Sequence, residues 1–160
     1  ITWIRREEYT RSLYPDGLTS WIDISKLILV VTMADQESVW VMEEFLKSKV
    51  SELIVCELQQ PIQYSSLRRL ILSFKKVREE RNAILPTILL VSSFNTAIIG
   101  VESRWYMRPS AMLANRKDFL LEKCWDLVCS KSRFNNSSWI IKSRQQNYNK
   151  IGINAYKSRS

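Results

Sequence analysis

The sequence predicts an α/β protein built on a mostly parallel sheet. Short apolar runs rich in β-branched residues alternate with segments in which apolar residues recur at helical spacing. The resulting order of strand, helix, strand, helix and strand is typical of right-handed βαβ units, which form parallel sheets. With 160 residues, the chain has the length of one ordinary domain. We therefore expect a three-layer fold, in which helices cover both faces of the sheet.

The first strand–helix–strand unit is expected within residues 26–58. Residues 26–33 (KLILVVTM) and 52–58 (ELIVCEL) are short apolar runs, as in strands buried on both faces. Between them, Asp35 is a suitable N-cap for a helix, because its carboxylate can accept hydrogen bonds from backbone N–H groups. The apolar positions at helical spacing in this helix are Val39, Met42, Leu46 and Val50. Before this unit, residues 14–17 (YPDG) indicate a turn.

The second unit contains the most regular helix of the sequence, with Ser65 as its expected N-cap. Its core-facing positions recur at helical spacing, and they are Leu67, Leu70, Ile71, Phe74 and Val77. Residues 87–91 (TILLV) predict a third strand, and residues 97–101 (AIIGV) a fourth. Residues 104–108 (RWYMR) indicate a basic and aromatic turn before Pro109. A last helix is expected over Phe119, Leu120, Trp125 and Val128, with Asn115 or Asp118 as its cap.

Charge divides the chain near residue 130. The whole sequence has 24 Lys and Arg residues against 16 Asp and Glu residues, a net charge of +8. Residues 131–160 hold seven of the basic residues and none of the acidic ones, so residues 1–130 carry a net charge of only +1. Helical periodicity is also lost after residue 131, where Ser, Asn and Gln dominate. We therefore expect an α/β body at residues 1–130, followed by a basic, extended and largely irregular tail at residues 131–160.

Composition favours a binding protein over an enzyme. The chain has no histidine, which removes Ser-His-Asp and Cys-His catalysis and histidine-based zinc sites. Its three glycines are too few for glycine-rich phosphate loops. The three cysteines, Cys56, Cys124 and Cys129, are expected to be reduced and buried. The longest apolar runs are far shorter than the roughly 20 residues of a membrane span, so we expect no membrane partner. Without histidine and without a glycine-rich loop, we also expect no cofactor and no small-molecule substrate.

Three weaker hypotheses concern catalytic or metal sites. Asp16 and Glu57 would serve as the acids of a PD-(D/E)xK nuclease, but a predicted helix separates them and the lysine is missing. Ser92 and Ser93 follow a strand at the end where α/β sheets often bind ligands, without a glycine loop or a base nearby. A cluster of carboxylates, usually solvated on a helix surface, is formed by Asp35, Glu37, Glu43 and Glu44. We expect no catalytic residue and no metal site.

The basic tail favours a nucleic acid as partner. Its Lys and Arg residues are interspersed with Trp139, Tyr148 and Tyr156. Such a composition supplies phosphate contacts and base stacking. The candidate RNA-binding residues are Arg104, Trp105, Arg108, Arg116, Lys117, Lys131, Arg133, Lys142, Arg144 and Lys150.

Several segments between residues 28 and 118 match one family pattern in order. Residues 28–35, followed by Gln36, Trp40 and Met42, correspond to an apolar segment that leads into Gly-His-Gln, Trp and Met. Further matches are Phe45, residues 53–58, residues 67–69 and residues 88–91. The most specific anchors are Arg104-Trp105 and residues 112–115 (MLAN), which match Arg-Trp and Met-Leu-Thr-Asn. These segments resemble the bacterial and organellar small-subunit ribosomal protein S-two family.

The chain also departs from that family. The early histidines and glycines are absent, so metal binding is not carried over, and the region between Val91 and Arg104 is too short for the usual helix. The periodicity makes residues 36–49 a helix, where the family has a loop and the start of a strand. The family's later half has no counterpart, so the resemblance implies a truncated fold.

The resemblance implies a structural constituent of a strongly diverged, mitochondrial small ribosomal subunit. Ribosomal RNA and other small-subunit ribosomal proteins are then the expected partners. An alternative from another class is a receiver- or TIR-like protein-interaction domain over residues 27–101, without RNA binding.

Overall fold

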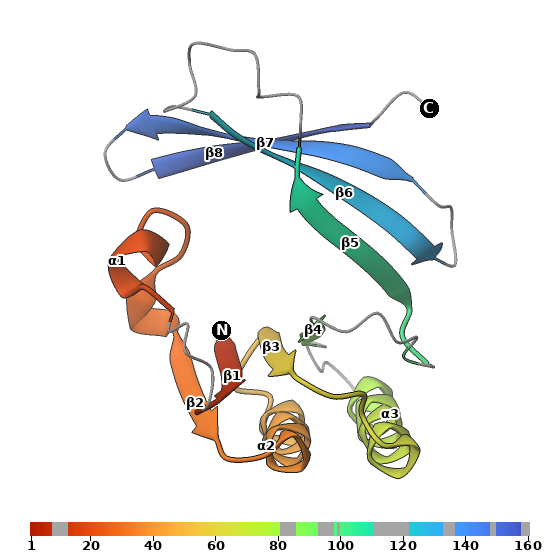
Figure 1. Cartoon of the computed structure of the whole chain (residues 1–160). Helices are drawn as coiled ribbons and strands as arrows, with labels where there is room; N and C mark the ends of the chain where they lie inside the picture. Colours follow the sequence, from red (N-terminus) through yellow and green to blue (C-terminus); the bar gives the residue numbers. More distant parts are fainter. Residues whose placement is uncertain are drawn as a thin grey trace. The chain divides into compact units, whose positions relative to one another are not determined.

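The chain forms two compact units in the computed structural model (Figure 1). The structure describes residues 1–7, 13–80, 86–92, 98, 100–110, 122–132, 137–147 and 150–157. The first unit, called the parallel unit here, comprises Ile1–Leu13 and Asp23–Gly100. The second, called the antiparallel unit, comprises Tyr14–Ile22 and Val101–Ser160. Each unit has its own four-stranded sheet, whereas the chain length predicted one domain.

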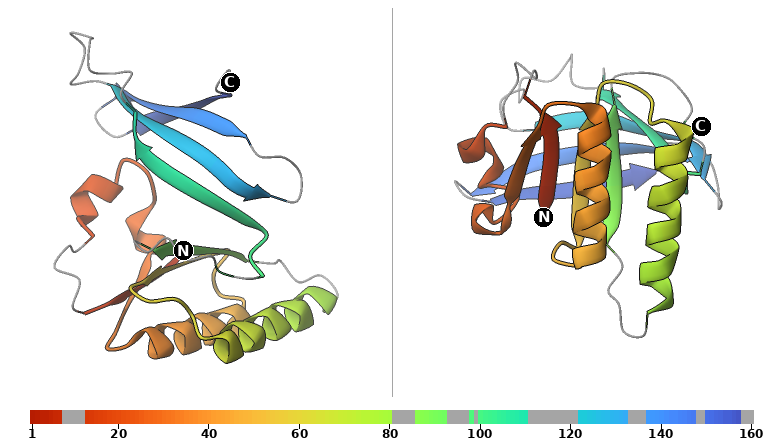
Figure 2. Two further views of the ribbon diagram at one scale, coloured as in Figure 1. Left: turned by 45° about the vertical axis from the view of Figure 1, so that its right-hand side comes forward. Right: turned by 90° about the horizontal axis from the view of Figure 1, so that it is seen from below.

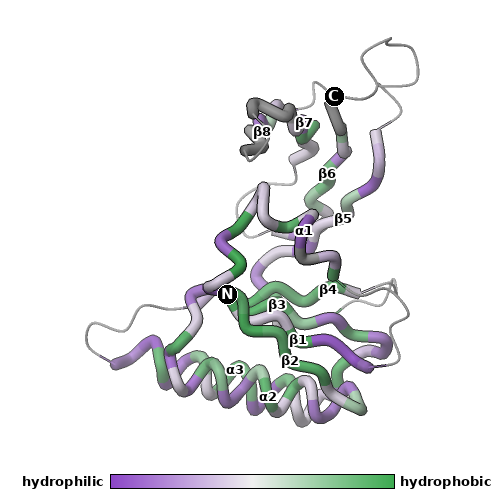
Figure 3. Tube along the Cα trace, turned by 90° about the vertical axis from the view of Figure 1, so that its left-hand side faces the viewer, coloured by the Kyte–Doolittle hydropathy of each residue, from purple (hydrophilic) through white to green (hydrophobic). Residues whose placement is uncertain are grey.

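The parallel unit confirms the α/β class and three of the predicted strands. Its strands are β1 (Thr2–Arg6), β2 (Ile28–Thr32), β3 (Leu53–Leu58) and β4 (Thr87–Ser92). They lie in the order β2-β1-β3-β4, and all pairs are parallel. Figure 3 shows that apolar residues dominate these strands. β1 was not predicted, because its two arginines obscure the alternation that buries Thr2 and Ile4.

Helices α2 (Asp35–Ser48) and α3 (Tyr64–Glu79) both pack on one face of this sheet (Figure 2). The sequence predicted helices on both faces. The difference follows from the strand order, because the crossovers from β2 to β3 and from β3 to β4 run in the same direction across the sheet. Right-handed crossovers in one direction place their helices on the same face. The opposite face carries four exposed apolar side chains, which belong to Leu29, Val31, Leu89 and Val91.

The core of the parallel unit lies between the sheet and the two helices. Its completely buried members include Ile4, Met42, Leu46, Ile54 and Leu58. The predicted stripe of α3 is confirmed, with three buried members in Leu67, Leu70 and Val77.

Three details of the predicted helices are wrong. Val50 is exposed, because α2 ends at Ser48 and the chain turns away at Lys49, which has a left-handed φ of 57°. The N-cap of α2 is Ala34 rather than Asp35. The N-cap of α3 is Gln63 rather than Ser65.

The antiparallel unit is a meander of β5 (Ser103–Pro109), β6 (Glu122–Ser132), β7 (Ser138–Asn147) and β8 (Lys150–Lys157). Neighbouring strands are paired in antiparallel fashion throughout. The short helix α1 (Pro15–Leu18) belongs to the same unit and begins where the sequence indicated a turn. The 3₁₀ turn η1 (Ile24–Lys26) leads from this segment into β2.

This sheet corrects the predictions for the second half of the chain. The expected turn at residues 104–108 is strand β5, and Trp125 and Val128, expected in a helix, lie in β6. Residues 131–160, expected as an irregular tail, contain β7 and β8, and the expected boundary at residue 130 falls inside β6. Cross-strand pairing forms these strands, and a search for helical periodicity cannot detect it. The remaining residues of the expected last helix, Asn115, Asp118, Phe119 and Leu120, lie outside the described residues.

The predicted fourth strand at residues 97–101 receives no support. Its described members, Ile98, Gly100 and Val101, are not in a strand. Ala97 and Ile99 lie outside the described residues.

Candidate nucleic-acid interface on the antiparallel sheet

Alternation along the strands sorts the candidate residues onto two faces of the antiparallel sheet. Arg108 pairs with Asp126, Asp126 with Ile140, and Ile140 with Tyr156, so these side chains form one row across all four strands. Tyr106 and Lys142 lie two residues from this row along β5 and β7, and therefore on the same face. We call this the basic face and define it by Tyr106, Arg108, Lys142 and Tyr156.

The opposite face is apolar. Met107, Trp125, Ile141 and Ile153 occupy the alternate positions of the four strands, and together with Leu18 and Trp21 they line a pocket of about 330 Å³. Because only alternate positions line this pocket, its composition supports the assignment of the two faces. The apolar face explains why the antiparallel sheet folds with a short helix beside it. On the basic face, the side chains of Tyr106, Arg108 and Tyr156 are exposed.

Contacts on the basic face hold cations beside aromatic rings. The Nζ atom of Lys142 lies 5.7 Å from the centroid of the Tyr156 ring, which is within cation–π distance. The Nε atom of Arg108 lies 3.4 Å from Oδ2 of Asp126, yet the Arg108 side chain remains 75% exposed. Tyr106 is 45% exposed and Tyr156 is 53% exposed. Both rings and Arg108 are therefore accessible to a ligand, and Lys142 is partly exposed.

The structure brings together only part of the predicted RNA-binding set. Arg108 and Lys142 share the basic face, whereas Trp105 occupies an alternate position, where its indole N–H donates to Ser103 Oγ over 2.9 Å. Arg104 and Lys131 are directly opposed on β5 and β6, next to a register shift between Arg104 and Trp105.

The other predicted residues are described less fully. The backbones of Arg144 and Lys150 lie in β7 and β8, opposite Gly152 and Asn147. Arg116, Lys117 and Arg133 lie outside the described residues.

Two members of the basic face are absent from the predicted set. Tyr106 was assigned to a turn, and Tyr156 was noted only as one of the aromatic residues of the tail. The signal that could have found Tyr106 is the alternation of Arg104, Tyr106 and Arg108 with Trp105, Met107 and Pro109. Period-2 alternation indicates a strand and separates these residues onto two faces.

Net charge follows the boundary between the units. The parallel unit contains 12 basic and 11 acidic residues, a net charge of +1. The antiparallel unit contains 12 basic and five acidic residues, a net charge of +7. The excess positive charge therefore belongs to a folded sheet and its connections, where strand geometry fixes part of it in place.

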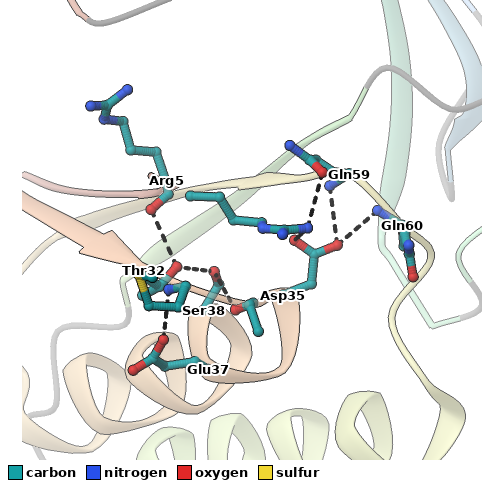
Figure 4. A network of polar contacts seen from close by, with 10 residues as sticks. Arg5, Thr32, Asp35, Glu37, Ser38, Gln59 and Gln60 are labelled. Atoms are coloured by element: carbon teal, nitrogen blue, oxygen red, sulfur yellow. Dashed lines mark hydrogen bonds and ion pairs between the residues drawn. The ribbon is translucent and has the colours of Figure 1, made fainter. Parts of the chain in front are cut away.

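The carboxyl edge of the parallel sheet is the usual ligand site of open α/β folds, and here the chain's own side chains occupy it (Figure 4). Oδ2 of Asp35 accepts hydrogen bonds from the backbone N–H groups of Gln59 at 3.2 Å and Gln60 at 2.8 Å. Arg6 donates to Oε1 of Gln59 at 2.9 Å and lies 3.9 Å from Oδ1 of Asp35. Two backbone donors at this edge are thus bound to a carboxylate of the chain itself.

Polar contacts at the start of α2 complete this edge. The hydroxyl groups of Thr32 and Ser38 are 2.6 Å apart, and the backbone N–H of Met33 donates to Oε2 of Glu37 at 2.7 Å. Within the described part of the chain, no three acidic or cysteine side chains gather as they would around a metal ion. These contacts therefore connect the end of β2, the start of α2 and the end of β3 to one another.

The prediction of buried, unpaired cysteines is confirmed for Cys56, Cys124 and Cys129. Burial, with a smaller effect from the charges of Asp35 and Glu57, raises the pKa of the Cys56 thiol to about 12. A thiol with so high a pKa remains protonated near neutral pH and is a poor nucleophile.

Comparison with known proteins identifies no family. No protein-family model matches the chain, and a search of curated proteins finds no match. Among the helices that the structure describes, none is long and apolar enough to cross a membrane.

Proposed function

We propose that this protein is a structural, RNA-binding constituent of the mitochondrial small ribosomal subunit. The observation that carries the RNA-binding part is the basic face, where Arg108 and Lys142 stand beside the exposed rings of Tyr106 and Tyr156. Lys and Arg side chains neutralise phosphates and so position a protein on RNA, while aromatic rings contact unpaired bases. The ribosomal part rests on the family resemblance of residues 28–118.

The charge distribution supports the same proposal. Because the antiparallel unit carries +7 and the parallel unit +1, RNA would be attracted mainly to the antiparallel unit. The parallel unit would then serve protein–protein contacts. On the sheet face opposite α2 and α3, the exposed apolar side chains of Leu29 and Val31 on edge strand β2 and of Leu89 and Val91 on edge strand β4 fit contact with a neighbouring small-subunit protein, because exposed apolar surface marks interaction sites. Such a neighbour would complete the three-layer arrangement that the sequence predicted.

The first experiment measures RNA affinity of the full-length chain as a function of salt concentration. We expect a linear decrease of log affinity with log salt. For single strands the slope is about 0.7 per neutralised phosphate. The double variant Arg108→Gln/Lys142→Gln should flatten the slope by about 1.4, if each cation contacts one phosphate. Full-length variants are preferable to a chain ended at residue 130, because that cut falls inside β6 and removes β7 and β8.

The matched control is Lys75→Gln/Lys76→Gln, which removes the same charge from the exposed side of α3. We expect this control to bind RNA with nearly the slope of the unmodified protein. RNA affinity that is absent, or that does not depend on salt, would contradict the proposal. Co-sedimentation with mitochondrial small ribosomal subunits tests the ribosomal part separately.

One observation favours a second candidate, the receiver- or TIR-like interaction domain. The strand order β2-β1-β3-β4 equals the first four positions of the 2-1-3-4-5 order found in flavodoxin-like sheets, which include receiver domains. Strand order alone does not determine function. Size-exclusion chromatography with light scattering distinguishes the two candidate functions. A stable homodimer that does not bind added RNA would favour the interaction domain.

A further inference from the structure

We propose that the basic face selects single-stranded RNA, by stacking unpaired bases on Tyr106 and Tyr156. This inference rests on the proposed RNA-binding function and adds the class of RNA that is bound. Duplex RNA is recognised mainly through its shape, phosphates and 2′-hydroxyl groups, because its bases are stacked within the helix. An exposed ring on a sheet can therefore stack only on a base that is unpaired.

The register of the sheet places the two rings at opposite borders of one surface. Tyr106 lies on the edge strand β5, and Tyr156 lies on the other edge strand, β8. Three strand spacings separate these strands, or about 14 Å, and the offset of two residues adds about 7 Å along the strand direction. A single strand that crosses the sheet can therefore meet both rings with different bases.

Side chains next to the rings supply the other contacts that a single strand needs. Lys142 stands 5.7 Å from the centroid of the Tyr156 ring, so a phosphate next to a stacked base would meet a cation. Arg108, which is paired with Asp126 and exposed, supplies a second cation near Tyr106. The half-buried side chains of Val128 and Ile140 lie on the same face between the rings, beside Asp126 and Ser138. Exposed rings with neighbouring cations are the elements of a base-stacking platform.

The test compares a labelled, unstructured 12-nucleotide RNA with a 12-base-pair RNA duplex, using fluorescence anisotropy and the full-length chain. Tyr106→Val and Tyr156→Val remove the rings but keep residues that favour strands. Each variant should bind the single strand about 5-fold to 100-fold more weakly, since stacking on an aromatic side chain contributes on that scale. Their affinity for the duplex and the salt dependence of binding should stay unchanged.

Two controls isolate the effect of the ring. Tyr156→Phe keeps the aromatic face and should bind the single strand like the unmodified protein. Tyr64→Val removes an even more exposed tyrosine from the start of α3, in the parallel unit, and should also leave affinity unchanged. Circular dichroism checks that each variant is folded. If the valine variants do not fold, photo-crosslinking of the unmodified protein to 4-thiouridine RNA replaces them, and crosslinks should map to the peptides containing Tyr106 and Tyr156.

Each negative result has a distinct meaning. Three results would overturn the stacking inference while leaving the proposed RNA binding intact. They are equal affinity for single strand and duplex, valine variants whose affinity for the single strand is unchanged, and crosslinks confined to other peptides. No affinity for either RNA would remove the proposed function itself. Binding of poly-glutamate as tight as that of RNA, and unaffected by the valine variants, would assign the basic face to an acidic protein surface and would overturn the inference.

Discussion

A single buried carboxylate joins the two helices of the parallel unit. Glu43 on α2 is almost completely buried and accepts hydrogen bonds from Arg69 Nε at 2.5 Å and Ser73 Oγ at 3.0 Å, both on α3. Lys47 Nζ lies 2.9 Å from the same carboxylate. Burial alone would raise the pKa of Glu43, but the hydrogen bonds from Lys47, Ser73 and Arg69 outweigh it and lower the pKa below 4.5. Glu43 is therefore ionised in the folded protein at neutral pH.

The lowered pKa of Glu43 predicts how stability depends on pH. A carboxyl group with a lower pKa in the folded than in the unfolded state contributes stability above its unfolded pKa, and this contribution is lost as the pH falls through the folded pKa. We therefore expect the free energy of unfolding in urea to decrease below about pH 4.5. Glu43→Gln should lower stability at pH 7 by about 2 kcal/mol, because charged hydrogen bonds are lost.

The Glu43→Gln variant should also lose less stability than the unmodified protein between pH 5 and pH 3, since it lacks the titrating group. Glu44→Gln is the matched control: its carboxylate is exposed and pairs with Lys47 at the surface, so a change below about 0.5 kcal/mol is expected. If the free energy of unfolding falls equally with pH in the unmodified protein and in Glu43→Gln, Glu43 is not the group responsible for the pH dependence of stability.

At the level of elements, sequence patterns predicted the parallel unit far better than the antiparallel one. Helix α3 shows its buried stripe at regular helical spacing, and β3 is an almost continuous apolar run. Strand β7 (SWIIKSRQQN) is harder to recognise, because Ile140 and Ile141 are adjacent and face opposite sides of the sheet. Its partner strands β6 and β8 are neighbours in the sequence, but their pairing with β7 leaves no helical periodicity. The candidate interface was predicted only in part for the same reason: two of its cations were predicted, but their shared face depends on register.

Helix α2 offers a test of the core at the same scale. Met42 is completely buried beneath α2, whereas Trp40, two residues earlier, is 55% exposed. Met42→Ala should lower the free energy of unfolding by about 2–5 kcal/mol, because it removes buried apolar contacts and leaves a cavity. Trp40→Ala, although it deletes a larger side chain, should change it by less than about 0.5 kcal/mol. Urea unfolding of both variants checks the prediction, and the reverse order of effects would contradict the assignment of the buried face.

For the whole molecule, the division into two units separates the apolar core of the parallel unit from the charged sheet. The basic face lies entirely in the antiparallel unit, as does most of the net charge. Fold stability of the parallel unit and RNA affinity should therefore respond to different substitutions.

This separation predicts the behaviour of one variant in two assays. Under conditions where Met42→Ala remains folded, its RNA affinity and salt dependence should match those of the unmodified protein within about twofold, because sites that share no partners act nearly independently and Met42 belongs to the core of the parallel unit, whereas the basic face belongs to the antiparallel unit. Anisotropy titration with the single-stranded RNA measures this. A loss of affinity as large as that of Tyr156→Val would show that the parallel unit takes part in RNA binding.

The segment Tyr14–Ile22 lies between β1 and β2 in sequence but belongs to the antiparallel unit. During synthesis it emerges early, whereas the strands that carry its pocket partners Met107, Trp125, Ile141 and Ile153 emerge only after β4. All four strands of the parallel sheet are available by Ser92, so this unit can fold while translation continues. The side chains of Leu18 and Trp21 therefore lack their pocket partners until strands β5 to β8 have been synthesised. The order of synthesis thus lets the antiparallel unit mature only after the parallel unit.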